Sequence, residues 1–188
     1  MKVSREEAAR NRQRIVEAAA RLFREKGFDG IGVAGLMKEV GLTHGGFYGH
    51  FQSKDDLEAE ACTRVLDRSL ARWADRSAAA RGDPLSAITD AYLTARHRDD
   101  PGTGCLLAAL GPDVARRGPG VRRAVTGYLG GAFDLLAGLV PGKSKAARRR
   151  KAIGTYASLV GALVLARAVD DDGLSREILD AVRDSMHS

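Results

Sequence analysis

The segment from residue 145 to residue 169 constrains the fold of this chain most, because it is apolar on most sides of a helix. Its apolar residues are Ile153, Tyr156, Leu159, Val160, Leu163, Val164 and Leu165. A helix of this kind must be buried on more than one face, so other helices have to surround it. The segment therefore predicts a helical protein with a sizeable core.

The remainder of the chain also carries helix signals, and no segment shows the alternation of a strand. Ser4 with Glu7 forms a capping box, Thr43 and Ser53 are good N-caps, and Asp83-Pro84 is a strong helix start. Together these signals predict an all-α chain of about nine helices, over residues 4–27, 33–40, 44–50, from 54 onward, 84–98, 105–116, 119–140, 145–169 and 174 onward.

Charge and motif content favour a binding protein over an enzyme. Residues 1–54 hold ten Lys and Arg against six Asp and Glu, which is +4 of the chain's net +6. A basic N-terminal region suits a polyanionic partner. The sequence has no Walker loop, nucleophile elbow, dinucleotide-binding glycine motif or C-x-x-C pair, and its histidines have no i, i+4 spacing. We therefore expect no enzymatic activity, no cofactor and no metal.

The segment from residue 33 to residue 51 has the spacing of a helix-turn-helix. A helix of about two turns precedes a turn at Gly41, Leu42 and Thr43, and a second short helix follows. The major groove of DNA admits one helix whose N-terminal residues meet the base edges. The pattern predicts that the second helix reads DNA.

Residues 10–58 resemble the head of TetR-family (TetR/AcrR-like) transcriptional regulators over one continuous register. The matching positions are Gly27, Val33, Gly41, Leu42, Thr43, Gly45, Phe47, Tyr48, His50, Phe51, Ser53, Lys54 and Leu57. The body resembles the family only in its length, its helix count and its long apolar penultimate helix. The resemblance implies a three-helix DNA-binding domain over residues 1–53 and a ligand-binding and dimerisation domain over 54–188.

The resemblance and the side-chain chemistry together assign the DNA contacts. Thr43 caps the recognition helix and bonds a phosphate, His44 reaches a base edge, and Gly45 lets the backbone approach the groove. The remaining contacts are expected from Tyr48, His50 and Lys54, mainly to the DNA backbone. Phe47 and Phe51 are expected in the core of the head.

Four glycines depart from the family pattern in the head. Gly32 stands where a capping Thr or Ser is usual, and Gly35 stands where an acid is common. Gly46 and Gly49 lie inside the recognition helix, where each costs about 0.5–1 kcal/mol relative to alanine. We expect a flexible recognition helix that orders fully only on DNA.

The resemblance implies a homodimer in which the last two helices pair with those of a second copy. The expected interface residues are Tyr156, Val160, Leu163, Val164, Ile178 and Val182. A single helical core of a monomer is the alternative for these residues. Two heads on one dimer would meet two half-sites about 34–36 Å apart on double-stranded operator DNA.

The resemblance also implies a small-molecule ligand inside the body, whose binding moves the helix that follows the head. The expected lining residues are Trp73, Tyr92, Cys105, Leu106, Tyr128, Phe133 and Tyr156, with ordinary core packing as the alternative for each. Cys105 also supports a different hypothesis, because a thiol at a helix start can become a sensor of oxidants or electrophiles. Cys62 is expected to be structural.

The sequence as a whole predicts a cytoplasmic, sequence-specific DNA-binding regulator of transcription, a repressor released by an unknown small molecule. No apolar run approaches the 20 residues of a membrane span, so no membrane partner is expected. Two alternatives remain: a thiol-based redox regulator that uses Cys105, and a DNA-binding factor without a ligand.

Overall fold

The computed structural model describes residues 4–187, and these residues form ten helices and no strand, which confirms the all-α prediction. The helices are α1 (Arg5–Lys26), α2 (Val33–Glu39), the 3-10 helix η1 (His44–Gly49), α3 (Lys54–Ala79), α4 (Pro84–Tyr92), α5 (Ala95–Asp99), α6 (Leu106–Val114), α7 (Pro119–Leu139), α8 (Lys145–Ala168) and α9 (Asp172–His187). None of them is long and apolar enough to cross a membrane.

The predicted N-caps are confirmed at four helix starts. The side chains of Ser4, Thr43, Ser53 and Asp83 each accept a hydrogen bond from the backbone N–H three residues later, at 3.1, 3.3, 3.1 and 2.8 Å. Each cap satisfies one of the backbone donors that a helix start leaves free.

The single helix predicted for residues 84–98 is wrong, because the chain breaks it into α4 and α5. Leu93 leaves the helical conformation with φ −89° and ψ 64°, and its side chain is fully buried. Thr94 then caps α5 by accepting from the His97 N–H at 3.1 Å. A threonine side chain can replace the backbone bond that a continuous helix would have supplied.

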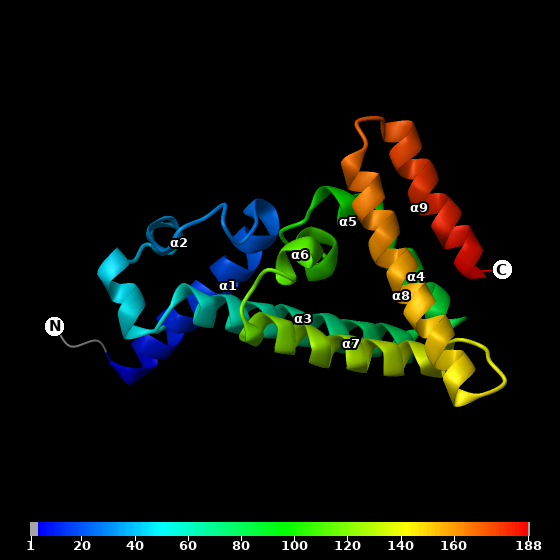
Figure 1. Ribbon diagram of the computed structural model, residues 1–188, viewed down its shortest axis with the longest axis horizontal. Helices are drawn as coiled ribbons and strands as arrows, with labels where there is room; N and C mark the ends of the chain where they lie inside the picture. Colours follow the sequence, from blue (N-terminus) through cyan, green and yellow to red (C-terminus); the bar gives the residue numbers. More distant parts are fainter. Residues whose placement is uncertain (1–3, 188) are drawn as a thin grey trace.

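The helices form an elongated molecule with a head at one end (Figure 1). The head consists of α1, α2 and η1, and α1 packs on α3. The long helices α3 and α7 lie side by side along the molecule, and α8 and α9 form a pair at the other end. One hydrophobic core runs from Ile15 in the head to Leu179 in α9. The helix α3 therefore links the head to the body.

Candidate functional site

The two short helices of the head are joined by a tight turn. The Gly41 residue has φ 69°, the left-handed conformation that glycine adopts without strain. The Leu42 N–H donates to the Met37 carbonyl at 2.8 Å, and the Gly41 N–H donates to the Lys38 carbonyl at 3.0 Å. These bonds end α2 and set the direction of the segment that follows.

The segment η1 presents one face to the core and the other to solvent. Phe47 is 0% exposed and stacks on the buried Phe51 with 5.4 Å between the ring centroids, as expected for the core of the head. Tyr48 is 64% exposed, and its ring lies edge-on to His44 with centroids 5.9 Å apart. Thr43, His44 and Gly45 are also exposed, and His50 is half-buried. An exposed large aromatic residue beside polar residues is typical of a binding surface.

The recognition segment is a 3-10 helix of six residues. Three of the six are glycine, at positions 45, 46 and 49, and glycine disfavours the α-helix because it loses most conformational freedom on folding. The 3-10 form is tighter and has poorer hydrogen-bond geometry than the α-helix. The segment therefore has its cap and its buried anchor, but little regular helix between them.

The Lys54 side chain is used inside the protein, although the sequence predicts a phosphate contact. Its ammonium donates to the Phe28 carbonyl at 2.5 Å and lies 3.8 Å from a carboxylate oxygen of Glu58. It also lies 5.9 Å from the centre of the Phe23 ring. In this state, Lys54 fastens the start of α3 to the loop that follows α1.

A buried carboxylate, which the sequence analysis missed, joins the head to the body. Glu58 is 1% exposed and lies 3.8 Å from the Lys54 ammonium and 3.9 Å from the Arg117 guanidinium. Arg117 also pairs with Asp29 and lies 4.9 Å from the centre of the Phe28 ring. Burial raises the pKa of Glu58, whereas the charges of Arg117 and Lys54 oppose that rise. The loop before α7 is thereby tied to the head.

A cavity of about 160 Å³ lies between α3, α4 and the loop that leads to α6. Three of the seven predicted ligand residues line it, namely Trp73, Tyr92 and Cys105. The other four are absent from its lining. Leu106 and Tyr128 are buried, the Tyr156 hydroxyl donates to the Tyr128 hydroxyl at 3.4 Å, and Phe133 packs edge-on against Tyr156. These four residues belong to the core that supports the cavity.

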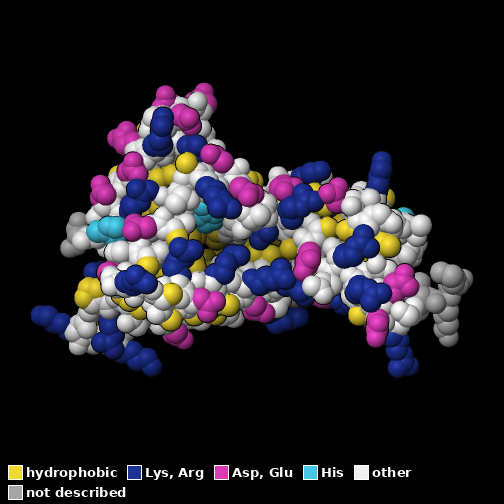
Figure 2. All heavy atoms as spheres, turned by 180° about the vertical axis from the view of Figure 1, so that it is seen from behind, with side chains coloured by type: hydrophobic (Ala, Val, Ile, Leu, Met, Phe, Trp, Pro, Cys, Tyr) yellow, Lys and Arg dark blue, Asp and Glu magenta, His cyan; other side chains and the backbone are white. Residues whose placement is uncertain are grey.

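The cavity also holds polar residues that the sequence analysis did not single out. They are Ser69, Arg72, Arg76, His97 and Thr103. On the face drawn in Figure 2, Lys and Arg side chains gather beside a hollow with apolar side chains in its floor. The spacing of the arginines along α3 is the sequence signal that could have revealed them, because residues four apart share one helix face.

His97 has both ring nitrogens occupied by backbone groups. Nε2 accepts from the Cys105 N–H at 2.8 Å, so it carries no proton, and Nδ1 therefore donates to the Tyr92 carbonyl at 2.7 Å. A Cβ atom on Gly104 would come within 2.8 Å of the ring, so glycine is needed there. Burial, and then the charges of Arg167 and Arg72, lower the pKa of His97.

These contacts make His97 a source of pH-dependent stability. The pKa of His97 is lowered in the folded state. Its contribution to the unfolding free energy is therefore complete when the pH is above the usual histidine pKa of about 6.5, and it is lost as the pH falls below that value. We expect the unfolding free energy to fall by up to about 1.4 kcal/mol per pH unit below that value. The loss should be smaller in His97→Gln. Urea unfolding at pH 7.5 and pH 5.5 measures the difference, and equal losses in both proteins would contradict this role.

The two cysteines differ in accessibility, as the sequence predicts for Cys62. Cys62 is 1% exposed, and burial raises its pKa to about 12, whereas Cys105 is partly exposed and lines the cavity. We expect a thiol reagent to modify Cys105 quickly in the folded protein and Cys62 only after unfolding. Mass spectrometry after brief alkylation should find the label on Cys105. Fast labelling of Cys62 would contradict the buried assignment.

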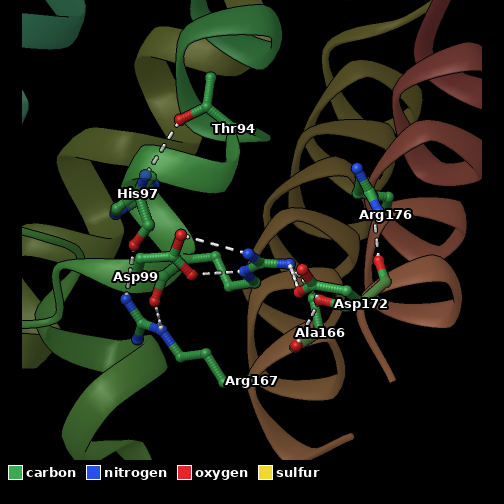
Figure 3. Close-up of polar contacts among 9 residues, drawn as sticks. Thr94, His97, Asp99, Ala166, Arg167, Asp172 and Arg176 are labelled. Carbon is green, nitrogen blue, oxygen red and sulfur yellow. Dashed lines mark hydrogen bonds and ion pairs between the residues drawn. The ribbon is translucent and has the colours of Figure 1, made fainter. Parts of the chain in front are cut away.

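The helix α5 is held by an arginine from α8 (Figure 3). Arg167 donates through Nε to the Arg98 carbonyl at 2.9 Å and through Nη2 to the His97 carbonyl at 2.7 Å. Arg98 in turn donates to Ser175 at 2.8 Å and lies 3.3 Å from Asp172, both in α9. The cavity wall that carries His97 is therefore connected to α8 and α9.

The predicted dimer residues divide between two faces of α8 and α9. Tyr156 and Leu163 are 4% and 0% exposed and pack within their own chain, so they face away from any partner of α8. Val164 is 39% exposed, and Val160, Ile178 and Val182 are half-buried. The outer face of this region carries the large exposed residues Ile153, Val164, Leu165 and Leu174.

Comparison with known proteins finds relatives of the head and of the whole fold. Residues 15–61 match the family described as bacterial regulatory proteins, tetR family. An HTH-type transcriptional regulator of Staphylococcus aureus (strain USA300) is 42% identical over 66 residues, which are 35% of this chain and 34% of the relative. The chain thus matches this curated relative over about a third of its length.

Solved structures extend the similarity to the whole fold. A TetR-family regulator from Cytophaga hutchinsonii has a TM-score of 0.80 at 19% identity, covering 100% of this chain and 97% of that one. A TetR regulator from Chloroflexus aurantiacus has a TM-score of 0.80 at 22% identity, covering 97% of each chain. The reduced form of NemR from E. coli has a TM-score of 0.79 at 21% identity, covering 94% of this chain and 95% of that one.

The head and the fold together define a helical bacterial regulatory protein with a helix-turn-helix. Residues 15–61 carry the TetR-family head, and the chain has the fold of solved TetR-family regulators. Its named relatives are described as regulators of transcription.

Proposed function

We propose that this chain is a homodimeric, sequence-specific DNA-binding regulator of transcription, in which residues 1–53 bind the operator and residues 54–188 bind a small molecule and form the dimer. The observation that carries the proposal is the capped segment η1, which displays Tyr48 at 64% exposure while Phe47 anchors it in the core. The release of a repressor by the small molecule is part of the proposal.

The DNA-facing residues in this proposal are those exposed along η1 and beside it. The Thr43 hydroxyl accepts from the Gly46 N–H, so its own proton is free to donate to a phosphate. His44 and Gly45 stand at the N-terminal end of η1, where a recognition helix meets the base edges. Tyr48 and the half-buried His50 suit the DNA backbone. Lys54 contributes least, because the Phe28 carbonyl already binds its ammonium.

The exposed apolar face of α8 and α9 supports the dimer. Ile153 and Leu165 are 42% and 57% exposed. A Cβ at Gly154 or Gly161 would meet no atom within 4 Å, so both glycines leave room for a neighbouring helix. A second copy that covered this face would bury its apolar surface and hold two heads at a fixed spacing.

The position of α3 supports regulation by a ligand. Its first residues hold the head through Lys54 and Glu58, and its C-terminal half lines the cavity through Arg72 and Trp73. A ligand that binds more tightly to one placement of α3 shifts the population of head spacings toward that placement. The presence of a cavity favours this proposal over a DNA-binding factor without a ligand.

The test compares alanine substitutions at two glycines of η1. The measured quantity is the affinity for duplex DNA from the region upstream of the chain's own gene. A Cβ at Gly45 or Gly49 meets no atom within 4 Å, so alanine at either position should leave the fold intact or raise its stability by about 0.5–1 kcal/mol. We expect Gly45→Ala to weaken specific DNA binding by about tenfold, since its Cβ would obstruct the groove. Gly49→Ala, further from the bases, is the matched control.

Fluorescence anisotropy at several salt concentrations measures the binding, with random duplex DNA as the reference. Tight binding of a dimer to the upstream DNA, weakened by Gly45→Ala alone, supports the proposal. Equal and weak binding to both DNAs would contradict it, as would equal effects of the two alanines.

The accessible Cys105 favours a second candidate, a thiol-based regulator. Its side chain lines the cavity directly before α6, and Cys62 is too buried to compete with it. Alkylation of the Cys105 sulfur, with the thiol proton and the leaving group of the electrophile released to solvent, would add a group inside the cavity. Release of DNA by an electrophile should then disappear in Cys105→Ser. Unchanged release in that variant would exclude this candidate.

A further inference from the structure

The cavity beside α3 carries positive charge without an acidic residue in its lining. Arg72 and Arg76 line it, and no Asp or Glu does. Neither arginine makes an ion pair or a side-chain hydrogen bond with any residue in the range 4–187. A guanidinium is a planar, permanently charged donor that matches the geometry of a carboxylate.

These two arginines end a row of four along α3. Arg64, Arg68, Arg72 and Arg76 follow one another at intervals of four residues, so they share a helix face. Glu17 of α1 compensates the first two, at 3.5 Å from Arg64 and 3.1 Å from Arg68. Arg72 and Arg76, the two arginines of the row that line the cavity, have no such carboxylate partner.

The field around the row is positive at a second, independent place. Arg24 of α1 lies near Arg72, and its pKa falls to about 10, first because of burial and then because of the Arg72 charge. A second hollow adjoins the cavity and shares Arg72 and Thr103 with it. It is lined by Arg24, Arg64, Arg68 and Arg72 against the single carboxylate of Glu17. Like charges held this close favour an anion between them.

The lining of the cavity also includes two aromatic residues and a polar group without an oxygen or nitrogen partner. Trp73 and Tyr92 lie edge-on to each other, with ring centroids 6.0 Å apart. Tyr92 is 6% exposed, and its hydroxyl has the weakly bonding Cys105 thiol beside it but no oxygen or nitrogen partner. A buried hydroxyl without a partner is costly, so a polar ligand atom beside it would be favoured.

The size of the cavity and the start of α6 narrow the choice of ligand. The volume of about 160 Å³ is close to the roughly 150 Å³ of an engineered protein cavity that holds benzene. Cys105, the N-cap of the nine-residue α6, lines the cavity without making a side-chain cap bond. The positive end of that helix adds to the preference for an anion.

We propose that this cavity binds a carboxylate carried on a single aromatic ring, with the carboxylate at Arg72 and Arg76 and the ring against Trp73 and Tyr92. The Tyr92 hydroxyl donates to the same ligand. The binding itself stands on the cavity alone, whereas its effect on DNA rests on the proposed function. The regulator is thus a sensor of small aromatic acids.

The test uses benzoate as the probe, with benzamide as a neutral analogue of similar shape and benzylamine as a cation. Trp73 is the only tryptophan of the chain, so its fluorescence reports on this cavity, and isothermal titration calorimetry gives the dissociation constant. We expect benzoate to bind about tenfold or more tightly than benzamide, because hydrogen bonds to charged groups contribute most. Benzylamine should not bind.

Substitutions at Arg72 and Arg76 test whether these two side chains bind the carboxylate. Arg72→Gln and Arg76→Gln should each weaken benzoate binding by about tenfold, and Arg72→Lys should retain part of it. Arg68→Gln is the matched control, since Arg68 shares the helix face but pairs with Glu17 outside this cavity. Arg68, Arg72 and Arg76 are exposed, so each can be changed with little effect on the core, and circular dichroism verifies the fold of each variant.

Absence of benzoate binding overturns the proposal, as does equal binding of benzamide or equal binding by the Arg72→Gln and Arg76→Gln variants. The DNA assay separates this result from the proposed function. If benzoate binds without weakening operator binding, the proposed ligand class is supported and the release of DNA by the ligand is excluded. Operator binding without benzoate binding removes only the ligand class.

Discussion

The Phe47→Ala variant is expected to lose about 3–5 kcal/mol of unfolding free energy, because it removes a fully buried aromatic side chain and leaves a cavity. Phe47 is 0% exposed, stacks on Phe51 and anchors η1 to the rest of the head. Loss of this anchor should also abolish DNA binding, since Tyr48 and His44 would no longer be held in place. Urea unfolding followed by circular dichroism measures the stability, and anisotropy measures the DNA affinity.

The neighbouring aromatic residue provides the control. Tyr48 is 64% exposed, so Tyr48→Ala should change the unfolding free energy by no more than about 0.5 kcal/mol. Its DNA affinity should nevertheless fall clearly, because the proposed contact to the DNA backbone is lost. The pair therefore separates folding from binding at adjacent positions. A stable Phe47→Ala protein, or a Tyr48→Ala protein that binds DNA normally, would contradict the assignment of the two faces of η1.

The second large effect is expected at Arg167. Its two hydrogen bonds, at 2.9 and 2.7 Å, end on the carbonyls of Arg98 and His97 in α5. Arg167→Met keeps much of the side-chain volume but leaves both carbonyls without this donor. Since hydrogen bonds from a charged group contribute about 1.5–3 kcal/mol each, we expect a loss of about 3 kcal/mol in urea unfolding. The cavity should also loosen, because α5 carries His97.

Arg176 is the matched control for Arg167 (Figure 3). It is exposed on α9, and its Nε donates to the Asp172 carbonyl of its own helix at 3.1 Å. Arg176→Met should therefore stay within about 0.5 kcal/mol of the original protein. Arg167→Lys should lie between the two, since an ammonium lacks the fork that reaches both carbonyls. Equal stability of the Arg167→Met and Arg176→Met proteins would show that α5 is held by other contacts.

The sequence predicted most of the fold because helix starts are local. Ser4, Thr43, Ser53 and Asp83 each act on amides within three residues, so their effect is visible without tertiary information. The break at Leu93 was missed because its cause is tertiary. Leu93 is buried completely, and Thr94 supplies the replacement cap.

The candidate site was less predictable, because it depends on which side of each helix faces which neighbour. The sequence identified Trp73, Tyr92 and Cys105, which line the cavity, but it could not separate them from the core residue Tyr156. The inward use of Lys54 depends on the Phe28 carbonyl, which lies 26 residues earlier in the chain. Contacts at that separation leave no local pattern to read.

The glycines of η1 limit how much operator sequence a single head can specify. Positions 45, 46 and 49 have no side chain, and Phe47 is buried, so only His44 and Tyr48 extend outward from the six residues. Since His44 is proposed to reach a base edge and Tyr48 to contact the DNA backbone, one head can distinguish few base pairs. Such a short recognition sequence recurs many times in a genome. Under the proposed function, the remaining specificity comes from the distance and the symmetry between the two DNA half-sites. The paired arrangement of the heads then does most of the discriminating, and a change in that arrangement would alter which operators are occupied without altering a single base contact.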